Sequence, residues 1–315
     1  MSKTSTESAC QPFGRGSCTS PQRGVETDSL WRWRYAAHLG FPGPDTPYFQ
    51  SSAGPDPVEQ IKRAAKIGFV AQADRHFMMR PPEEQIRIGR ALAEHGLQLS
   101  SFVDHPREPL GPWNRIDNES KHTLRRRLNA SFAAARHVRC SFVTIVSAID
   151  PSLLVEDQVA ALVHNLGWAA TMAEEAGVRL CLEPVSRERV EGALITNVDV
   201  GSQVVARVNS PSCRLSFDTL HVALESGDVA AAYRRVALQV GLIQIAERDR
   251  LEPGSGTIDF AALSACIQES GYPGIIELEH CHSLPGRRGE ALSLKRLAAF
   301  DRIEFGSTQS ARSSP

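Results

Sequence analysis

Short apolar runs alternate along the chain with longer segments in which apolar residues recur every three or four positions. The short runs are apolar almost throughout, as expected for strands of a parallel sheet that is covered on both faces. The pattern predicts eight such strands, over residues 35–39, 69–74, 97–103, 142–147, 178–183, 214–218, 242–246 and 275–279.

The longer segments carry signals of helix starts and ends. Asp56 and Pro57 provide an N-cap and a proline at the first helical position, and Gly68 follows as a stop. A helix that starts at Pro82 ends in the same way at Gly96. Further helices are predicted over residues 155–176, 197–208, 229–240, 260–270 and 290–305.

This alternation of eight strands with helices predicts an α/β fold, a parallel (β/α)₈ TIM barrel. A doubly wound open sheet is the alternative, but the GxGxxG turn expected after its first strand is missing from the sequence. The Ser-, Thr- and Gly-rich ends predict disordered tails at 1–32 and 306–315, with a catalytic barrel domain over 33–305.

Composition narrows the function classes. A net charge of −1 favours neither a nucleic acid nor a membrane surface as partner. No apolar run approaches the roughly 20 residues that span a bilayer. The 7 cysteines form no CxxC pair, which argues against a structural zinc site or a disulfide framework and suggests a cytoplasmic protein.

Oxygen-bearing side chains close four consecutive predicted strands: Glu183, Asp218, Gln244 and Glu279. In a barrel of this kind, catalytic residues gather at the carboxyl ends of the strands. A single aspartate there often only caps the next helix, but three neighbouring buried carboxylates require a compensating cation. The all-oxygen set suits Mg²⁺ or Mn²⁺ better than Zn²⁺.

Two further residues lie near this set in the sequence. His221 comes one helical turn after Asp218, and Arg250 comes six residues after Gln244. Each has an ordinary interpretation, as a helix-start histidine and as a loop ion pair. Beside a metal ion, both are suited to binding substrate oxygens and developing negative charge.

These residues lie in segments that resemble a known family. LEP at 182–184, FDTLH at 217–221, QIAERDR and EPGSG within 244–256, and GYPGIIELE at 271–279 resemble the sugar isomerase/epimerase superfamily with the xylose isomerase-like barrel. Gln244 and its QIA context are most similar to hydroxypyruvate isomerases, whereas ERDR with GSGTIDF is similar to ketose 3-epimerases. The likeness covers about residues 34–300 and is specific in the second half. In the first half, VAQADR at 70–75 replaces the family's acid near the end of the second strand.

The resemblance implies a divalent-metal-dependent isomerase that moves a proton through a metal-bound enediolate of a small hydroxy-carbonyl substrate. Glu183 and Glu279 would form the acid/base pair, and His221 and Arg250 would bind the substrate. One Mg²⁺ or Mn²⁺ would be held by Glu183, Asp218, Gln244 and Glu279. Because barrels of this family are often dimers or tetramers, the resemblance also allows a homo-oligomer.

Four functions therefore remain for comparison. The first is an isomerase of the hydroxypyruvate type, and the second is a ketose 3-epimerase that performs the same chemistry on a longer sugar. The third is an abasic-site endonuclease, which would need more histidine ligands and a basic face for DNA. The fourth is a barrel without catalytic activity that binds a sugar or a partner subunit, although a complete ligand set argues against it.

Other polar residues receive simpler interpretations. Glu277 shares the strand parity of Glu279, and we expect an ion pair in a lower layer of the barrel. The basic run 125–127 is expected to be a solvated helix face, and Glu247 and Glu252 to form surface ion pairs. Trp113 is either a lid over the substrate or part of the hydrophobic packing of a loop.

Overall fold

The computed structural model describes residues 30–105 and 112–302, which form a parallel barrel. Within these ranges, nine strand segments make one sheet in the order β3-β2-β1-β9-β8-β7-β6-β5-β4. The two segments at its ends, β3 (Gln98–Leu99) and β4 (Ser101–Val103), are halves of the predicted third strand. The two segments are joined by Ser100, and its backbone closes the sheet into a barrel. The Ser100 N–H donates to the Gln72 carbonyl on one side, and the Ser100 carbonyl accepts from the Phe142 amide on the other. The predicted (β/α)₈ barrel is confirmed.

The other strands lie close to their predicted positions and pair in parallel in sequence order around the barrel. Their interior-facing residues are almost all buried, as the apolar runs require. The helix predicted over residues 229–240 is too long, because Val240 is already the first residue of a strand. The strands are β1 (Arg34–His38), β2 (Ala71–Ala73), β5 (Phe142–Ile145), β6 (Arg179–Leu182), β7 (Cys213–Asp218), β8 (Val240–Ile245) and β9 (Ile275–Leu278).

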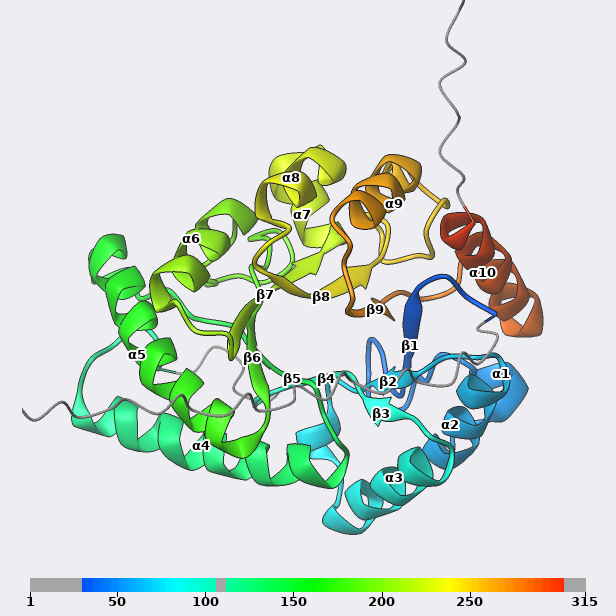
Figure 1. Ribbon diagram of the computed structural model, residues 1–315, viewed down its shortest axis with the longest axis horizontal. Helices are drawn as coiled ribbons and strands as arrows, with labels where there is room; N and C mark the ends of the chain where they lie inside the picture. Colours follow the sequence, from blue (N-terminus) through cyan, green and yellow to red (C-terminus); the bar gives the residue numbers. More distant parts are fainter. Residues whose placement is uncertain (1–29, 106–111, 303–315) are drawn as a thin grey trace, which may run out of the picture.

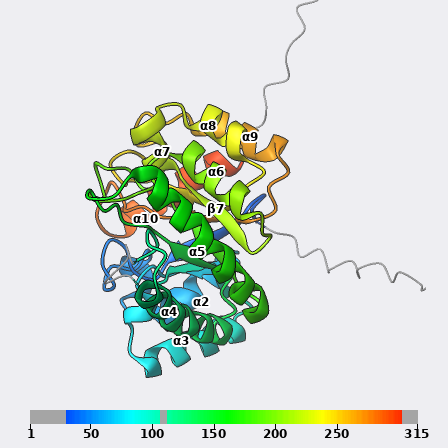
Figure 2. The same cartoon turned by 90° about the vertical axis from the view of Figure 1, so that its left-hand side faces the viewer.

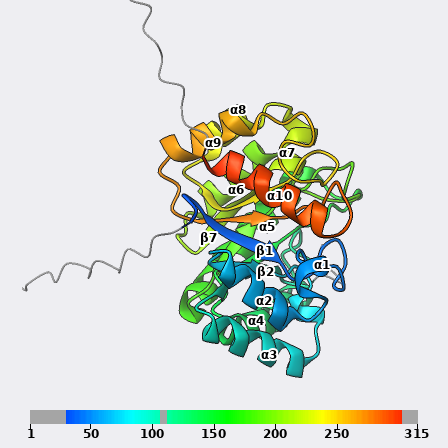
Figure 3. The same ribbon diagram turned by 90° about the vertical axis from the view of Figure 1, so that its right-hand side faces the viewer.

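Helices surround the strands on all sides (Figure 1). The side in Figure 2 is covered by the longest helices, α4 and α5, and the side in Figure 3 by α1, α2 and α10. The helices are α1 (Gln50–Ala53), α2 (Pro57–Lys66), α3 (Pro82–Glu94), α4 (Asn118–His137), α5 (Val155–Ala176), α6 (Val198–Val208), α7 (Thr219–Ser226), α8 (Val229–Val236), α9 (Phe260–Glu269) and α10 (Gly286–Asp301), with a 3₁₀ turn at Phe77–Met79.

The predicted helix ends have the expected physical basis. The Asp56 carboxylate caps α2 by accepting from the Val58 amide at 2.9 Å. Gly177 ends α5 with φ +70°, a left-handed conformation that glycine adopts without steric conflict. By contrast, α10 begins four residues before the predicted start at Glu290.

Two of the simpler interpretations are resolved by burial. Arg125 and Arg126 are exposed as expected, but Arg127 is buried, and its Nε donates to the Asp104 carboxylate at 3.2 Å. The expectation of a wholly solvated basic face is therefore wrong at Arg127. Trp113 is fully buried in the hydrophobic core and does not line the cavity described below, which supports loop packing over a lid.

The predicted tails lie outside the described residues except for 30–32. Trp31 in that short stretch packs against the barrel, where its indole N–H donates to the Ile67 carbonyl at 2.7 Å. Among the described helices, none combines the length and the apolar character needed to cross a membrane.

Candidate active site

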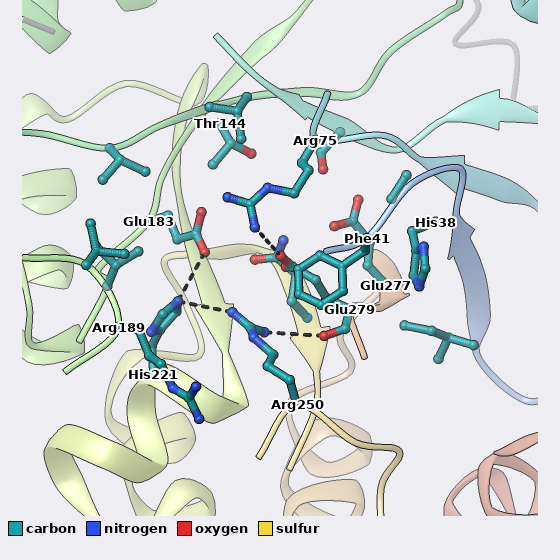
Figure 4. A pocket seen from close by; sticks show the side chains of 18 of the residues that line it. His38, Phe41, Arg75, Thr144, Glu183, Arg189, His221, Arg250, Glu277 and Glu279 are labelled. Atoms are coloured by element: carbon teal, nitrogen blue, oxygen red, sulfur yellow. Dashed lines mark hydrogen bonds and ion pairs between the residues drawn. The ribbon is translucent and has the colours of Figure 1, made fainter. Parts of the chain in front are cut away.

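A cavity of about 230 Å³ opens at the carboxyl ends of the strands. Figure 4 shows the side chains of Glu183, His221, Arg250, Glu279 and Arg75 approaching one another from several walls of the cavity. Of the six site residues predicted from sequence, five line this cavity, and the sixth, Asp218, lies buried directly behind it. The polar or aromatic residues of its lining include His38, Phe41, Arg75, Glu183, Arg189, His221, Gln244, Arg250, Glu277 and Glu279.

The strand register brings the acidic residues to one level. Asp218 at the end of β7 pairs with Gln244 of β8, which in turn pairs with Glu277 of β9. Glu183 and Glu279 each stand one residue beyond the end of their strands, β6 and β9. Parallel pairing therefore places side chains that are about a hundred residues apart in sequence at one rim of the barrel.

Both carboxylate oxygens of Asp218 have hydrogen-bond partners. One carboxylate oxygen caps α7 by accepting from the Leu220 amide at 2.8 Å. The other accepts from Arg250 Nη1 at 2.7 Å. Burial opposes the ionisation of Asp218, but the adjacent guanidinium outweighs it and holds the pKa of this carboxyl below its usual value.

The two glutamates are in the opposite situation. Burial raises the pKa of Glu183 well above its usual value, and the nearby carboxylates of Glu279 and Asp218 raise it further. Burial also raises the pKa of Glu279, against the effect of Arg250. Arg75 lies close to Glu279, with Nη1 3.8 Å from Oε1. Both glutamates therefore hold a proton more readily than a carboxyl in water does, as a general acid requires.

His221 is buried between these charges. Burial lowers the pKa of its imidazole to about 4, so the ring is neutral at pH 7. The Ser186 backbone N–H donates to Nδ1 at 3.1 Å. The other nitrogen, Nε2, faces the carboxylates, 4.0 Å from Glu183 Oε1 and 3.8 Å from Asp218 Oδ2. Arg250 Nη2 also lies 3.2 Å from Nε2. When Nδ1 accepts from Ser186, the neutral ring carries its proton on Nε2 and can donate to a substrate oxygen; only the other tautomer leaves Nε2 free to bind a metal ion.

Arg250 is held in place by its own loop. Its backbone adopts φ +62°, a left-handed conformation that is uncommon for a residue with a side chain. Its N–H donates to the Glu247 carbonyl, and its carbonyl accepts from the Cys281 amide at 2.7 Å. This fixed backbone directs the guanidinium to Asp218 and over the Phe41 ring, 5.4 Å from the centroid.

The loop that carries Arg250 depends on two buried carboxylates that we expected at the surface. Glu247 and Glu252 are both fully buried. Glu247 accepts hydrogen bonds from three backbone amides of the same loop. Glu252 binds Ser283 and pairs with Arg296 of α10 at 2.6 Å. The expectation of surface ion pairs is wrong for both, because the loop folds over them.

The donor atoms of the site fit a divalent cation. Glu183, Asp218 and His221 each place one potential ligand atom within 4.8 Å of the others, in a buried group. The Oε2 atom of Glu279 is buried and has no hydrogen-bond partner among the residues that the structure describes. A set of crowded carboxylates with an unsatisfied oxygen could hold a divalent cation. The sequence predicted His221 to bind the substrate, and its imidazole lies as close to Glu183 and Asp218 as a metal ligand would.

Sequence reasoning missed the contribution of the barrel's first half. His38 of β1, Phe41 and Arg75 all line the cavity, the last two from the loops after β1 and β2. The same rule that identified the acids, position just beyond a strand end, would have found Arg75. Glu277 also lines the cavity, where it accepts a hydrogen bond from the Ser100 hydroxyl. Among the described residues no arginine, lysine or histidine forms an ion pair with it, so the expected ion pair is wrong.

The family model described as xylose isomerase-like TIM barrel matches residues 61–300. The chain belongs to this family. L-ribulose 3-epimerase of Mesorhizobium japonicum is 33% identical over 123 residues, covering 39% of this chain and 41% of that protein. Hydroxypyruvate isomerase of Escherichia coli is 28% identical over 122 residues, covering 38% of this chain and 47% of the relative. Each alignment thus spans less than half of the curated relative.

Solved structures support the shared fold. The crystal structure of a family 2 AP endonuclease from Brucella melitensis superposes with a TM-score of 0.70 at 22% sequence identity. The superposition covers 83% of this chain and 98% of that chain. It shows that the xylose isomerase-like barrel is present nearly in full.

Proposed function

We propose that this chain is a divalent-metal-dependent isomerase or epimerase that transfers a proton beside the carbonyl of a small hydroxy-carbonyl compound. The observation that carries the proposal is a pair of glutamates, the buried Glu183 and the partly buried Glu279, which approach one cavity from β6 and β9 (Figure 4). Burial raises the pKa of both carboxyl groups, which favours their use as proton donors and acceptors. The names of the curated relatives support the same class of reaction.

The residues that would hold the cation are Glu183, Asp218, Gln244 and Glu279. When bound, a divalent cation polarises the substrate carbonyl and stabilises negative charge on its oxygen. The protein then has to remove a proton from the neighbouring carbon and return it elsewhere.

Glu183 and Glu279 are suited to that transfer. One carboxylate takes the proton from the carbon beside the carbonyl, and the same or the opposite carboxylate returns it to the other carbon or face. His221 and Arg250 bind the substrate oxygens meanwhile. The guanidinium of Arg250 stabilises the developing oxyanion, a contribution typically worth about 3 kcal/mol for such a donor.

Charge within the cavity favours an acid as substrate. Two guanidinium groups, those of Arg75 and Arg250, face three carboxylates, those of Glu183, Asp218 and Glu279. A bound divalent cation then leaves an excess of one positive charge while Glu277 is protonated. A substrate with its own carboxylate, such as hydroxypyruvate, would neutralise this excess, whereas a neutral ketose would not.

A substrate panel tests the proposal. The purified protein, supplied with Mg²⁺ or Mn²⁺, is incubated with hydroxypyruvate, tartronate semialdehyde and C5–C6 ketoses, and the products are separated by chromatography. We expect turnover of an acid, and loss of roughly 10²–10⁴-fold or more in kcat for Glu183→Gln and Glu279→Gln. Circular dichroism of each variant controls for folding. Substantial residual activity in both variants would refute the acid/base assignment.

A ketose 3-epimerase is the second candidate, favoured by the likeness to L-ribulose 3-epimerase and by the two glutamates on different walls of the cavity. Turnover of ketoses alone in the same panel would select it. Binding of metal without turnover of any compound would favour a barrel that has no catalytic activity.

A further inference from the structure

A carboxyl group that the proposed reaction does not use lies beneath the acidic rim. Glu277 points into the barrel from β9, is 2% exposed, and lines the floor of the cavity. Interior positions of such barrels are usually filled by branched apolar side chains, and a buried carboxyl without a cation is costly. Its presence therefore requires an explanation in terms of its contacts.

The contacts of Glu277 are all hydrogen-bond donors. Ser100, at the seam that closes the barrel, donates its hydroxyl to Oε1 at 2.5 Å. Burial raises the pKa of this carboxyl, and the neighbouring Ser101 and Gln244 side chains act against that effect as hydrogen-bond donors would. Gln244 is its direct neighbour, because the two residues are paired in the register of β8 and β9.

The Gln244 side chain lies between Glu277 and a hydroxyl on the other neighbouring strand. Its Oε1 accepts from Ser216 Oγ of β7 at 2.7 Å. A serine hydroxyl can donate or accept, so Ser216 alone would tolerate either orientation of the amide. The Glu277 carboxyl mainly accepts, so it attracts the NH₂ group to the β9 side and turns the oxygen toward β7. That strand also carries Asp218, paired in register with Gln244.

We propose that Glu277 is a positioning residue that orients the Gln244 amide so that its oxygen, and not its NH₂ group, is presented to the divalent cation. Only the oxygen of a glutamine side chain can bind Mg²⁺ or Mn²⁺. Groups that orient a metal ligand in this way commonly contribute 10- to 100-fold to metal affinity. The inference rests on the proposed function, since it assumes that Gln244 is a ligand.

Calorimetric titration of the full-length protein with Mn²⁺ tests this role without any substrate. Glu277→Leu removes the acceptor, and we expect the Kd for Mn²⁺ to rise about 10- to 100-fold. Glu277→Gln retains one acceptor oxygen and should restore most of the affinity. In a Gln244→Ala background, Glu277→Leu should cause no further loss, because its effect passes through Gln244.

A matched control separates positioning from general destabilisation. Glu290 is another buried carboxylate, which accepts from the Ser51 amide at 2.6 Å and does not line the cavity. Glu290→Leu should lower the unfolding midpoint in urea while leaving the Mn²⁺ affinity unchanged.

The possible failures are distinguishable. Absence of Mn²⁺ binding by the wild-type protein would refute the proposed metal dependence itself. Wild-type binding with an unchanged Kd in Glu277→Leu would overturn only the positioning role. Losses that add in the double variant would also overturn it, because they would place the effect of Glu277 elsewhere than on Gln244.

Discussion

The loop that carries Arg250 should depend strongly on the charge of one buried residue. The Glu247 carboxylate accepts from Gly254 at 3.2 Å, Thr257 at 3.1 Å and Ile258 at 3.2 Å, all through backbone N–H groups. Glu247→Gln keeps the size of the side chain but replaces one oxygen with an NH₂ group. The perturbation therefore removes charge and one acceptor while changing shape very little.

The expected magnitude follows from these three bonds. Hydrogen bonds to a charged group contribute about 1.5–3 kcal/mol, compared with about 0.5–1.5 kcal/mol for neutral pairs. If the glutamine oxygen faces Thr257 and Ile258, those two bonds lose about 1 kcal/mol each, and the Gly254 N–H is left facing another donor at a cost of about 2 kcal/mol. The free energy of unfolding should fall by about 4 kcal/mol, a large part of the roughly 5–15 kcal/mol typical of folded proteins.

Urea denaturation followed by fluorescence and circular dichroism measures this loss. Glu225→Gln is the matched control, because Glu225 is exposed and accepts a single backbone N–H, from Arg187 at 3.1 Å. The control should change the free energy of unfolding by less than about 0.5 kcal/mol. A loss in Glu247→Gln as small as that of the control would refute the reasoning that Glu247 organises the loop.

Three further predictions concern stability, each measured by urea unfolding. Gly256→Ala should destabilise the loop, because its Cβ would lie 2.5 Å from Glu247 Oε2; a fully stable variant would contradict this close contact. Asp56→Ala should lose about 1 kcal/mol with the cap of α2, and Asp56→Asn should retain most of it. Burial lowers the pKa of His38 to about 3, below the ordinary value of about 6.5, so its neutral form stabilises the fold above pH 6.5. That contribution is lost as pH falls toward 3, by about 2 kcal/mol at pH 5, and His38→Gln should unfold with a correspondingly weaker pH dependence.

Much of the fold could be predicted because its signals are local. Apolar runs and helix caps reflect contacts within a few residues, and α5 has the bounds that its pattern predicted. The strand-end rule then located the acids, because parallel pairing brings the carboxyl ends of all strands to one rim. The division of the third strand at Ser100 was not predictable, since it results from closure against two other strands.

The errors share a physical cause, which is that charge alone does not report burial. Glu247 and Glu252 resemble surface residues in sequence, but the chain folds over them and supplies amides, hydroxyls and an arginine from α10. Arg127 is similar, because its partner Asp104 lies on another element 23 positions away. Interaction partners that only the tertiary structure brings together cannot be inferred from residues that are neighbours in the sequence.

The two halves of the barrel supply different parts of the cavity, and this division has a consequence for engineering. The acids come from β6 to β9 and the loops after them, whereas His38, Phe41 and Arg75 come from β1, β2 and their loops. A chimaera that keeps residues from β6 onward and receives a different first half should retain the reacting groups while presenting a different wall to the substrate. Such a chimaera would change which substrate binds while the residues proposed to transfer the proton stay the same.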